Sequence, residues 1–216
     1  MPAAAATDAR FWDRVARKYA ADPIADMAGY ERTLDHTRRY LRPDDVVFEF
    51  GCGTGTTALR LAPHVSRIVA TDISGEMIAI AREKAQAEGC ANVEFETGTP
   101  DAPSWPDGTF DVALGFNVLH LLPEPEASLN GVRRLLKPGG LFVSKTPCLK
   151  EMNLFVRLIV PVMQLFGRAP YVAFFSGKEL ERKIEAAGFE IIDRARHASR
   201  GKDARPFFVA RKMIAS

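Results

Sequence analysis

The chain has 216 residues, of which 47% are hydrophobic and 26% charged, and its formal net charge is only +2. This composition is that of an ordinary globular protein with one core, so we expect a single domain over residues 1–216. A nearly neutral charge gives no reason to expect a nucleic-acid partner. The cysteines Cys52, Cys90 and Cys148 lack the spacing of a disulfide framework or a zinc site.

The extreme N-terminus lacks the charged-then-apolar pattern of a signal peptide. In addition, no uncharged apolar run in the chain reaches the length needed to span a membrane. We therefore expect the protein to be cytoplasmic. Residues 1–8 are expected to be disordered.

Residues 1–42 are expected to form helices that cap the domain. Residues 9–20 are amphipathic, and their apolar face carries Phe11, Val15 and Tyr19. We expect this helix to pack over a ligand cleft. A helix on a membrane surface is the less favoured alternative, because the stretch lacks a long Lys-rich face. A second helix is expected over residues 28–41.

Residues 46–57 read Val-Val-Phe-Glu-Phe-Gly-Cys-Gly-Thr-Gly-Thr-Thr, which predicts a buried strand, a glycine-rich turn and the start of a helix. The glycines of the turn are Gly51, Gly53 and Gly55. Such a turn presents bare backbone N–H groups and a positive helix end to a ligand. In a dinucleotide fingerprint the third glycine would stand at Thr56. Glu49 would repel a pyrophosphate and suit an ammonium group. A glycine-rich turn without a ligand is the much less favoured alternative.

A second strand is predicted over residues 67–72. It ends in Asp72, which stands 21 residues beyond Gly51, where cofactor-binding βαβ units place the acid that receives ribose hydroxyls. Asp72 could instead cap the next helix, but Ser74 is better placed to do so. We therefore favour the ribose role. Two apolar side chains are expected to flank an adenine ring: Ile73 and Met77.

Further strands are predicted over residues 92–97 and 110–116, and Lys-Pro-Gly-Gly at 137–140 leads into a fifth strand. The glycine motif with Glu49, Asp72 at the end of the second strand and the Lys-Pro-Gly-Gly turn together resemble class I S-adenosylmethionine-dependent methyltransferases. The resemblance covers residues 10–147 and the last forty residues by topology. It is strongest with the branch that methylates quinone precursors, phenols, lipids or amines.

This resemblance implies S-adenosylmethionine as the cofactor, S-adenosylhomocysteine as the product and in-line methyl transfer to a small acceptor. It puts Glu49 at the amino end of the methionine part. The expected cofactor residues also include Cys52, Thr99, Pro100 and Asn117. Two positions depart from the family pattern: Thr99 replaces a frequent acid, and Pro100 has no N–H to donate to adenine. Asp101 is the alternative adenine partner.

The candidate proton acceptors for catalysis are His120 and Tyr19, followed by His36 and Tyr171. His120 comes shortly after the fourth strand, at the sheet edge where ligands bind. A structural role for this lone histidine is an equal alternative. Many methyltransferases need no general base.

Residues 148–176 form the part of the chain least similar to the family, and we expect an apolar lid there. The apolar content of residues 153–175 suggests a lipophilic or aromatic acceptor, or a surface that contacts a membrane or a partner. Core packing is an equal alternative. Peripheral membrane contact of the protein as a whole is not favoured.

The C-terminal part predicts a capped helix over residues 177–187 and two strands, at 189–195 and 206–212. Strands that alternate with helices imply an α/β fold. We expect a doubly wound, Rossmann-like, seven-stranded and mostly parallel sheet with an antiparallel last strand and helices on both faces.

Two other function classes remain open, as does the oligomeric state, for which we expect a monomer or a homodimer. A nucleotide-dependent oxidoreductase would use the same fold, although Glu49 and the early third glycine argue against it. A non-catalytic module could bind S-adenosylmethionine and use its apolar segment to contact a partner.

Overall fold

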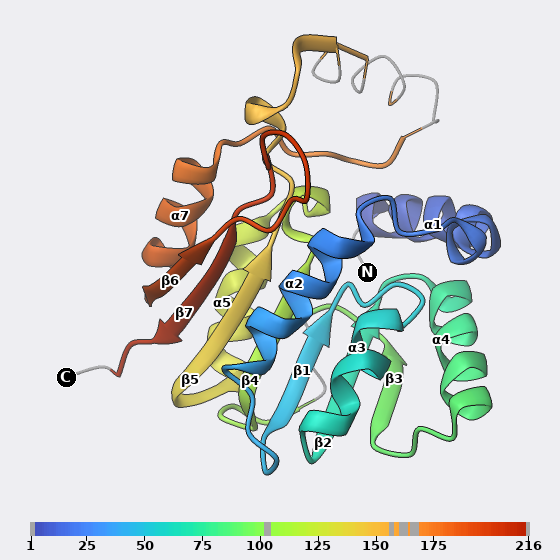
Figure 1. Ribbon diagram of the computed structural model, residues 1–216, viewed down its shortest axis with the longest axis vertical. Helices are drawn as coiled ribbons and strands as arrows, with labels where there is room; N and C mark the ends of the chain where they lie inside the picture. Colours follow the sequence, from blue (N-terminus) through green and yellow to red (C-terminus); the bar gives the residue numbers. More distant parts are fainter. Residues whose placement is uncertain (1–2, 102–104, 156–157, 160–163, 165–168, 215–216) are drawn as a thin grey trace.

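The computed structural model describes residues 3–101, 105–155, 158–159, 164 and 169–214, and a sheet runs through its centre (Figure 1). Within the described residues the sheet has seven strands in the order β3-β2-β1-β4-β5-β7-β6. Pairing is parallel throughout, except that β7 is antiparallel to both β5 and β6. The strands are β1 (Val46–Phe50), β2 (Arg67–Asp72), β3 (Val93–Thr97), β4 (Phe110–Phe116), β5 (Leu136–Lys145), β6 (Phe189–Ala195) and β7 (Phe207–Lys212). The predicted fold class is confirmed, and the last strand lies inside the sheet between β5 and β6.

Helices cover both faces of this sheet because successive residues of each buried strand point to opposite sides. Val47 packs in the cluster that contains residues of α2, α3 and α4. Phe48, one residue later, packs with side chains of α5 and α7 on the other face. The described helices are α1 (Ala3–Ala21), α2 (Met27–Arg38), α3 (Thr56–Leu61), α4 (Gly75–Glu88), α5 (Pro125–Leu135) and α7 (Gly177–Ala186).

The helix α1 lies across the carboxyl edge of the sheet and packs against α4 (Figure 1). Trp12 and Ala16 contact Met77 of α4, and the Asp13 carboxylate accepts a 2.6 Å hydrogen bond from the Ser74 hydroxyl. The helix begins at Ala3, so the expectation of disorder over residues 1–8 is wrong for residues 3–8. The physical reason is the run of alanines from Ala3, since alanine has the highest helix propensity.

Local signals in the sequence account for most element boundaries. The Ser74 hydroxyl caps α4 by accepting from the Met77 N–H, and Ser176 forms a capping box with Glu179 at the start of α7. The expected Lys-Pro-Gly-Gly turn is an irregularity inside β5. Phe110 of β4 pairs with Leu136 of β5. The next pair joins Val112 to Leu141, so the register of the two strands shifts at this point.

The expected apolar lid at 148–176 is described only in part, because residues 156–157, 160–163 and 165–168 lie outside the described residues. Among the described ones, Leu154, Phe155 and Leu158 are 65%, 71% and 63% exposed. These three side chains therefore do not pack in the core. The segment stands beyond the carboxyl edge of the sheet (Figure 1). Within the described residues, none of the helices is long and apolar enough to cross a bilayer.

Candidate functional site

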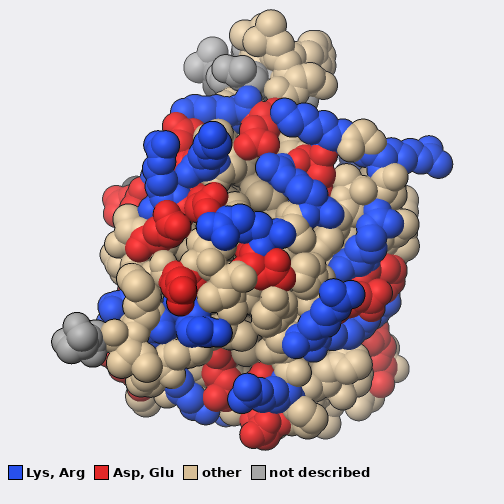
Figure 2. Space-filling model, turned by 60° about the vertical axis from the view of Figure 1, so that its left-hand side comes forward, with Lys and Arg blue, Asp and Glu red and all other residues tan. Residues whose placement is uncertain are grey.

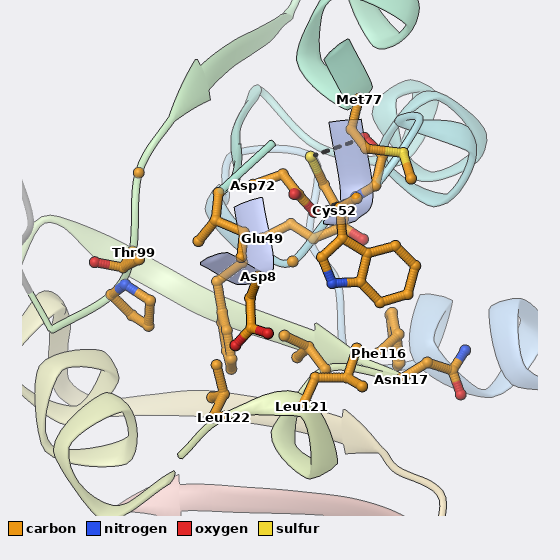
Figure 3. A pocket seen from close by; sticks show the side chains of 18 of the residues that line it. Asp8, Glu49, Cys52, Asp72, Met77, Thr99, Phe116, Asn117, Leu121 and Leu122 are labelled. Carbon is orange, nitrogen blue, oxygen red and sulfur yellow. Dashed lines mark hydrogen bonds between the residues drawn. The ribbon is translucent and has the colours of Figure 1, made fainter. Parts of the chain in front are cut away.

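A cavity opens at the carboxyl ends of β1, β2 and β4, beneath α1. We call it the glycine-turn cavity, and residues from five separate stretches of the chain line it, among them Asp8, Glu49, Gly53, Asp72, Thr99 and Asn117. Figure 3 shows Asp8, Glu49 and Asp72 near its middle, with Thr99 on one side and Asn117 on the other. A position at the carboxyl edge of an open α/β sheet is where ligands bind in such folds.

The three glycines of the turn have different physical roles, although all have positive φ angles. A Cβ atom on Gly53 would have Tyr19 Cε1 as its nearest neighbour, at 3.8 Å, so this residue presents bare backbone to the cavity. A Cβ atom on Gly51 would lie 2.3 Å from Val118 Cγ2. Gly55 does not line the cavity, and its Cβ would lie 2.7 Å from Phe95 Cζ. Gly55 thus serves the packing of the turn, contrary to its expected contact with the cofactor.

Glu49 is the most unusual side chain of the cavity. Its residue is only 2% exposed, and its Oε2 atom has no hydrogen-bond partner among the described residues. Burial, with a smaller contribution from the nearby Asp72 carboxylate, raises the pKa of Glu49 to about 8. A buried and unpaired carboxylate is costly, so this arrangement would be relieved by a cationic ligand group such as an ammonium.

Asp72 holds the glycine turn in place. Its Oδ2 accepts from the Gly53 N–H at 2.9 Å, and its Oδ1 accepts from the Ser74 N–H at 2.9 Å. Burial raises the pKa of Asp72 in spite of these backbone hydrogen bonds. Because a carboxylate offers about four acceptor sites, Asp72 keeps acceptor capacity toward the cavity that it lines. Ribose binding by Asp72 stays a prediction.

The cavity wall is acidic. It carries three carboxylates, from Asp8, Glu49 and Asp72, and no Lys, Arg or His side chain among the described residues. A pyrophosphate would meet unfavourable potential here, whereas a ligand that carries positive charge would be attracted. Asp8 was missed from the sequence because its segment was expected to be disordered.

The remaining expected cofactor residues line the same cavity: Cys52, Ile73, Met77, Thr99, Pro100 and Asn117. Asp101, the alternative adenine partner, is exposed and is not part of the wall. Trp12 of α1 joins the wall beside Met77. Its place on the amphipathic face of the first predicted helix was the signal that could have identified it.

Among the four candidate proton acceptors, only Tyr19 reaches the cavity. His120 does not line it, and burial lowers the pKa of its imidazole to about 4. The ring of His36 is engaged elsewhere, with Nε2 at 2.7 Å from Asp193 Oδ2. Tyr171 lines a different surface groove. Partial burial of Tyr19, with the Asp72 carboxylate, raises the pKa of its phenol.

A second cavity adjoins the first, and we call it the Lys145 cavity. Five residues line both cavities: Tyr19, Cys52, Thr57, Phe116 and Asn117. The second cavity adds polar groups that the sequence did not reveal, notably Thr33, Lys145 and Arg205. The two cavities therefore share one wall. Among the described residues, no group of His, Cys, Asp and Glu side chains could hold a metal ion.

Known proteins resemble this chain in sequence and in fold. Residues 47–140 match the family model described as "Methyltransferase domain". This stretch contains the glycine turn, Glu49, Asp72 and Asn117. This part of the chain is therefore similar to a methyltransferase domain.

Two curated relatives are named as methyltransferases. The uncharacterized methyltransferase YcgJ of Bacillus subtilis (strain 168) is 32% identical over 102 residues, which are 47% of this chain and 40% of that protein. The ubiquinone biosynthesis O-methyltransferase of Sinorhizobium fredii is 25% identical over 180 residues, which are 82% of this chain and 71% of the relative. The chain thus spans well under two thirds of the first relative.

The fold is shared with solved structures. The geranyl diphosphate C-methyltransferase of Streptomyces coelicolor A3(2), solved with Mg²⁺, geranyl diphosphate and S-adenosylhomocysteine, superposes with a TM-score of 0.74 at 13% identity. The superposition covers 99% of this chain and 98% of the other. The chain therefore shares the fold of this methyltransferase.

Proposed function

We propose that this protein transfers a methyl group from S-adenosylmethionine to a small acceptor by in-line displacement. The observation that carries the proposal is the unpaired carboxylate of Glu49, buried in an acidic cavity above the bare backbone of Gly53. When bound, S-adenosylmethionine supplies an electrophilic methyl group on a sulfonium centre. Its ammonium and sulfonium charges match a wall that has three carboxylates and, among its described residues, no basic side chain.

The side chains of the glycine-turn cavity would divide the work of binding. The Glu49 carboxylate would accept hydrogen bonds from the ammonium group, and Asp72 would accept from ribose hydroxyls while it holds the Gly53 N–H. Ile73 and Met77 would contact the adenine, and Trp12 would close the cavity from α1.

Catalysis would then depend on alignment and on exclusion of water, and positioning alone contributes roughly 7–11 kcal/mol in well-oriented reactions. The shared wall around Tyr19 and Asn117 is the point where an acceptor in the Lys145 cavity would meet the cofactor. Tyr19 is the best candidate there for a hydrogen bond to the acceptor. His120 has no part in the proposed mechanism.

The acceptor is proposed to be lipophilic or aromatic in part. Apolar side chains contribute to the Lys145 cavity, including Ile24, Leu34 and Phe116. Leu154, Phe155 and Leu158, whose side chains are exposed, belong to a segment beyond the same sheet edge (Figure 1). The Sinorhizobium fredii relative is named a ubiquinone biosynthesis O-methyltransferase, and this name supports an acceptor of this kind.

The test is calorimetric titration of the purified protein with S-adenosylhomocysteine and, in parallel, with NADH. We expect micromolar binding of the first ligand and no binding of the second. Labelled S-adenosylmethionine would then be used to screen acceptors. Binding of NADH alone would revive the oxidoreductase alternative. Tight cofactor binding with no methyl transfer to any acceptor would favour the non-catalytic module.

A further inference from the structure

The strongest unexplained feature outside the glycine-turn cavity is the buried lysine of the adjoining one. Lys145 ends β5 and its residue is only 6% exposed. Its Nζ donates one hydrogen bond, at 2.8 Å, to Thr33 Oγ1. An ammonium has three N–H donors, so among the described residues two of them have no partner.

The threonine cannot neutralise this charge. Its hydroxyl donates to the Gly29 carbonyl at 2.8 Å, so Thr33 Oγ1 accepts from Lys145 Nζ, and it also lies 3.1 Å from His197 Nδ1. His197 Nε2 in turn lies 3.0 Å from His36 Nδ1. These two histidines form a chain, which we call the histidine chain, that ends at the Thr33 oxygen contacted by Lys145.

Nearby carboxylates are committed to other groups. Asp203 accepts from the backbone N–H groups of His197, Ala198 and Arg205. Asp26 accepts from the backbone of Gly29 and Ser199. Neither forms an ion pair with Lys145, and among the described residues no other carboxylate lies within 4.0 Å of its Nζ.

Burial of an unpaired cation costs free energy, so binding of an anion next to Lys145 would be favourable. Desolvation is also the main cause that lowers the pKa of Lys145, to about 8, which leaves the side chain mostly protonated at neutral pH. The cavity opens toward the shared wall at Asn117, whose backbone N–H donates to the Lys145 carbonyl at 2.8 Å. An anionic group bound by Lys145 would thus lie beside the point of methyl transfer.

The charged side chains around the cavity favour a singly charged group over a doubly charged one. Asp22 and Asp26 also line the cavity, and Arg205 is already paired with Asp26 and Asp203. One cation, Lys145, is therefore left for a ligand. A carboxylate has the single charge that Lys145 can pair with. A doubly charged phosphate would be repelled more strongly by the two aspartates.

We propose that the methyl acceptor carries a carboxylate and that Lys145 binds it in the Lys145 cavity, which makes Lys145 a residue that determines acceptor specificity. This inference rests on the proposed methyltransferase function and adds the chemical class of its acceptor.

The experiment uses the full chain saturated with S-adenosylhomocysteine. Size-matched pairs of aromatic acids and their primary amides, such as 4-hydroxybenzoate with 4-hydroxybenzamide and 3,4-dihydroxybenzoate with its amide, are titrated by calorimetry. We expect the acid of a pair to bind about ten-fold more tightly than the amide, from a charged hydrogen bond that only the acid forms. In Lys145→Met the preference should fall below about three-fold.

The matched control is Lys212→Met. Lys212 is also a partly buried lysine that donates from Nζ to a single acceptor, the Leu136 carbonyl, but it lies at the other end of the sheet and lines neither cavity. This variant should keep the full preference for acids. Each variant must first bind S-adenosylhomocysteine with wild-type affinity, which also verifies that it folds. If Lys145→Met fails this check, Thr33→Val, which removes the acceptor that positions Lys145, is used in its place and should reduce the preference.

Three results would overturn the inference: equal binding of acids and amides, binding of neither, or a preference that persists in Lys145→Met. Loss of S-adenosylhomocysteine binding by the wild-type protein would instead defeat the proposed function itself. The two failures are therefore distinguishable.

Discussion

The two adjoining cavities are built in different ways. The glycine-turn cavity is formed largely by residues that follow β1, β2, β3 and β4 directly in the chain, such as Gly53, Ile73, Thr99 and Asn117. In the Lys145 cavity, by contrast, Thr33, Lys145 and Arg205 come from α2, β5 and the loop before β7. The first is a local consequence of strand ends, and the second exists only when distant segments meet.

The cavities also differ in charge. The first has carboxylates and no described basic side chain, and its most buried carboxylate is unpaired. The second contains a buried cation without an ion pair among the described residues. An unpaired carboxylate in one cavity and an unpaired cation in the next suit a cationic cofactor and an anionic acceptor. This contrast is local, because basic and acidic side chains are interspersed on the outer face in Figure 2.

The largest expected effect is that of Gly53→Val. A β-branched side chain at φ +54° is strained and would fill the space in front of the turn. We expect S-adenosylhomocysteine binding to fall by more than about 100-fold, measured by calorimetry. Circular dichroism should report an intact fold, because no atom lies closer than 3.8 Å to the added Cβ. A variant that still binds would contradict the close approach of ligand to this backbone.

Glu49→Gln should weaken S-adenosylhomocysteine binding by roughly ten-fold or more, since it removes a charged partner of the ammonium. The same change should raise the stability of the free protein at pH 8. Because the folded-state pKa of Glu49 is raised to about 8, the folded protein holds a proton that the unfolded chain releases near pH 4.5. Wild-type stability therefore falls as pH rises through this window.

Thermal melts of wild type and Glu49→Gln from pH 5 to pH 8 check this sign. The two melting temperatures should be closest at pH 5, and the variant should gain on the wild type as pH increases. A variant that is less stable than wild type at pH 8 would mean that the Glu49 carboxylate has a partner in the free protein.

Asp72→Ala should weaken S-adenosylhomocysteine binding by about ten-fold. It should also lower the melting temperature, because the Gly53 and Ser74 N–H groups lose their acceptor. Asp13→Ala is the matched control, since Asp13 accepts from Ser74 and Glu76 but lies outside the cavity wall. That control should lose stability and keep its affinity. Unchanged affinity in Asp72→Ala would remove Asp72 from the cofactor site.

The smallest expected effect tests the independence of the two cavities. Asp193 accepts from the Tyr40 hydroxyl at 2.6 Å and pairs with His36 at 2.7 Å, at the end of the histidine chain that leads to Thr33. Asp193→Asn should lower the melting temperature by about 2–4 °C. Calorimetry should find its S-adenosylhomocysteine affinity within about two-fold of wild type. A larger loss of affinity would mean that the chain also supports the glycine-turn cavity.

The sequence by itself determined the order of strands and helices, because the signals that define them are local. Apolar runs predicted β1, β2 and β4 with their observed bounds, and Ser74 and Ser176 marked the helix starts. The glycine turn with Glu49 and Asp72 indicated the cofactor class for the same reason, since all its parts lie in or directly after two consecutive strands.

Only the tertiary structure decided which residues meet across the sheet. Gly55 was expected to contact the ligand, whereas in the structure it allows the turn to pack against α4 and β3, which leave no room for a side chain there. The tertiary structure brought Asp8 to the cavity and left His120 out of it. Lys145 and Thr33 are 112 residues apart, and no local pattern reports a contact at that separation. Contacts between distant segments can be identified only from the folded sheet, which brings the ends of their strands and helices to one edge.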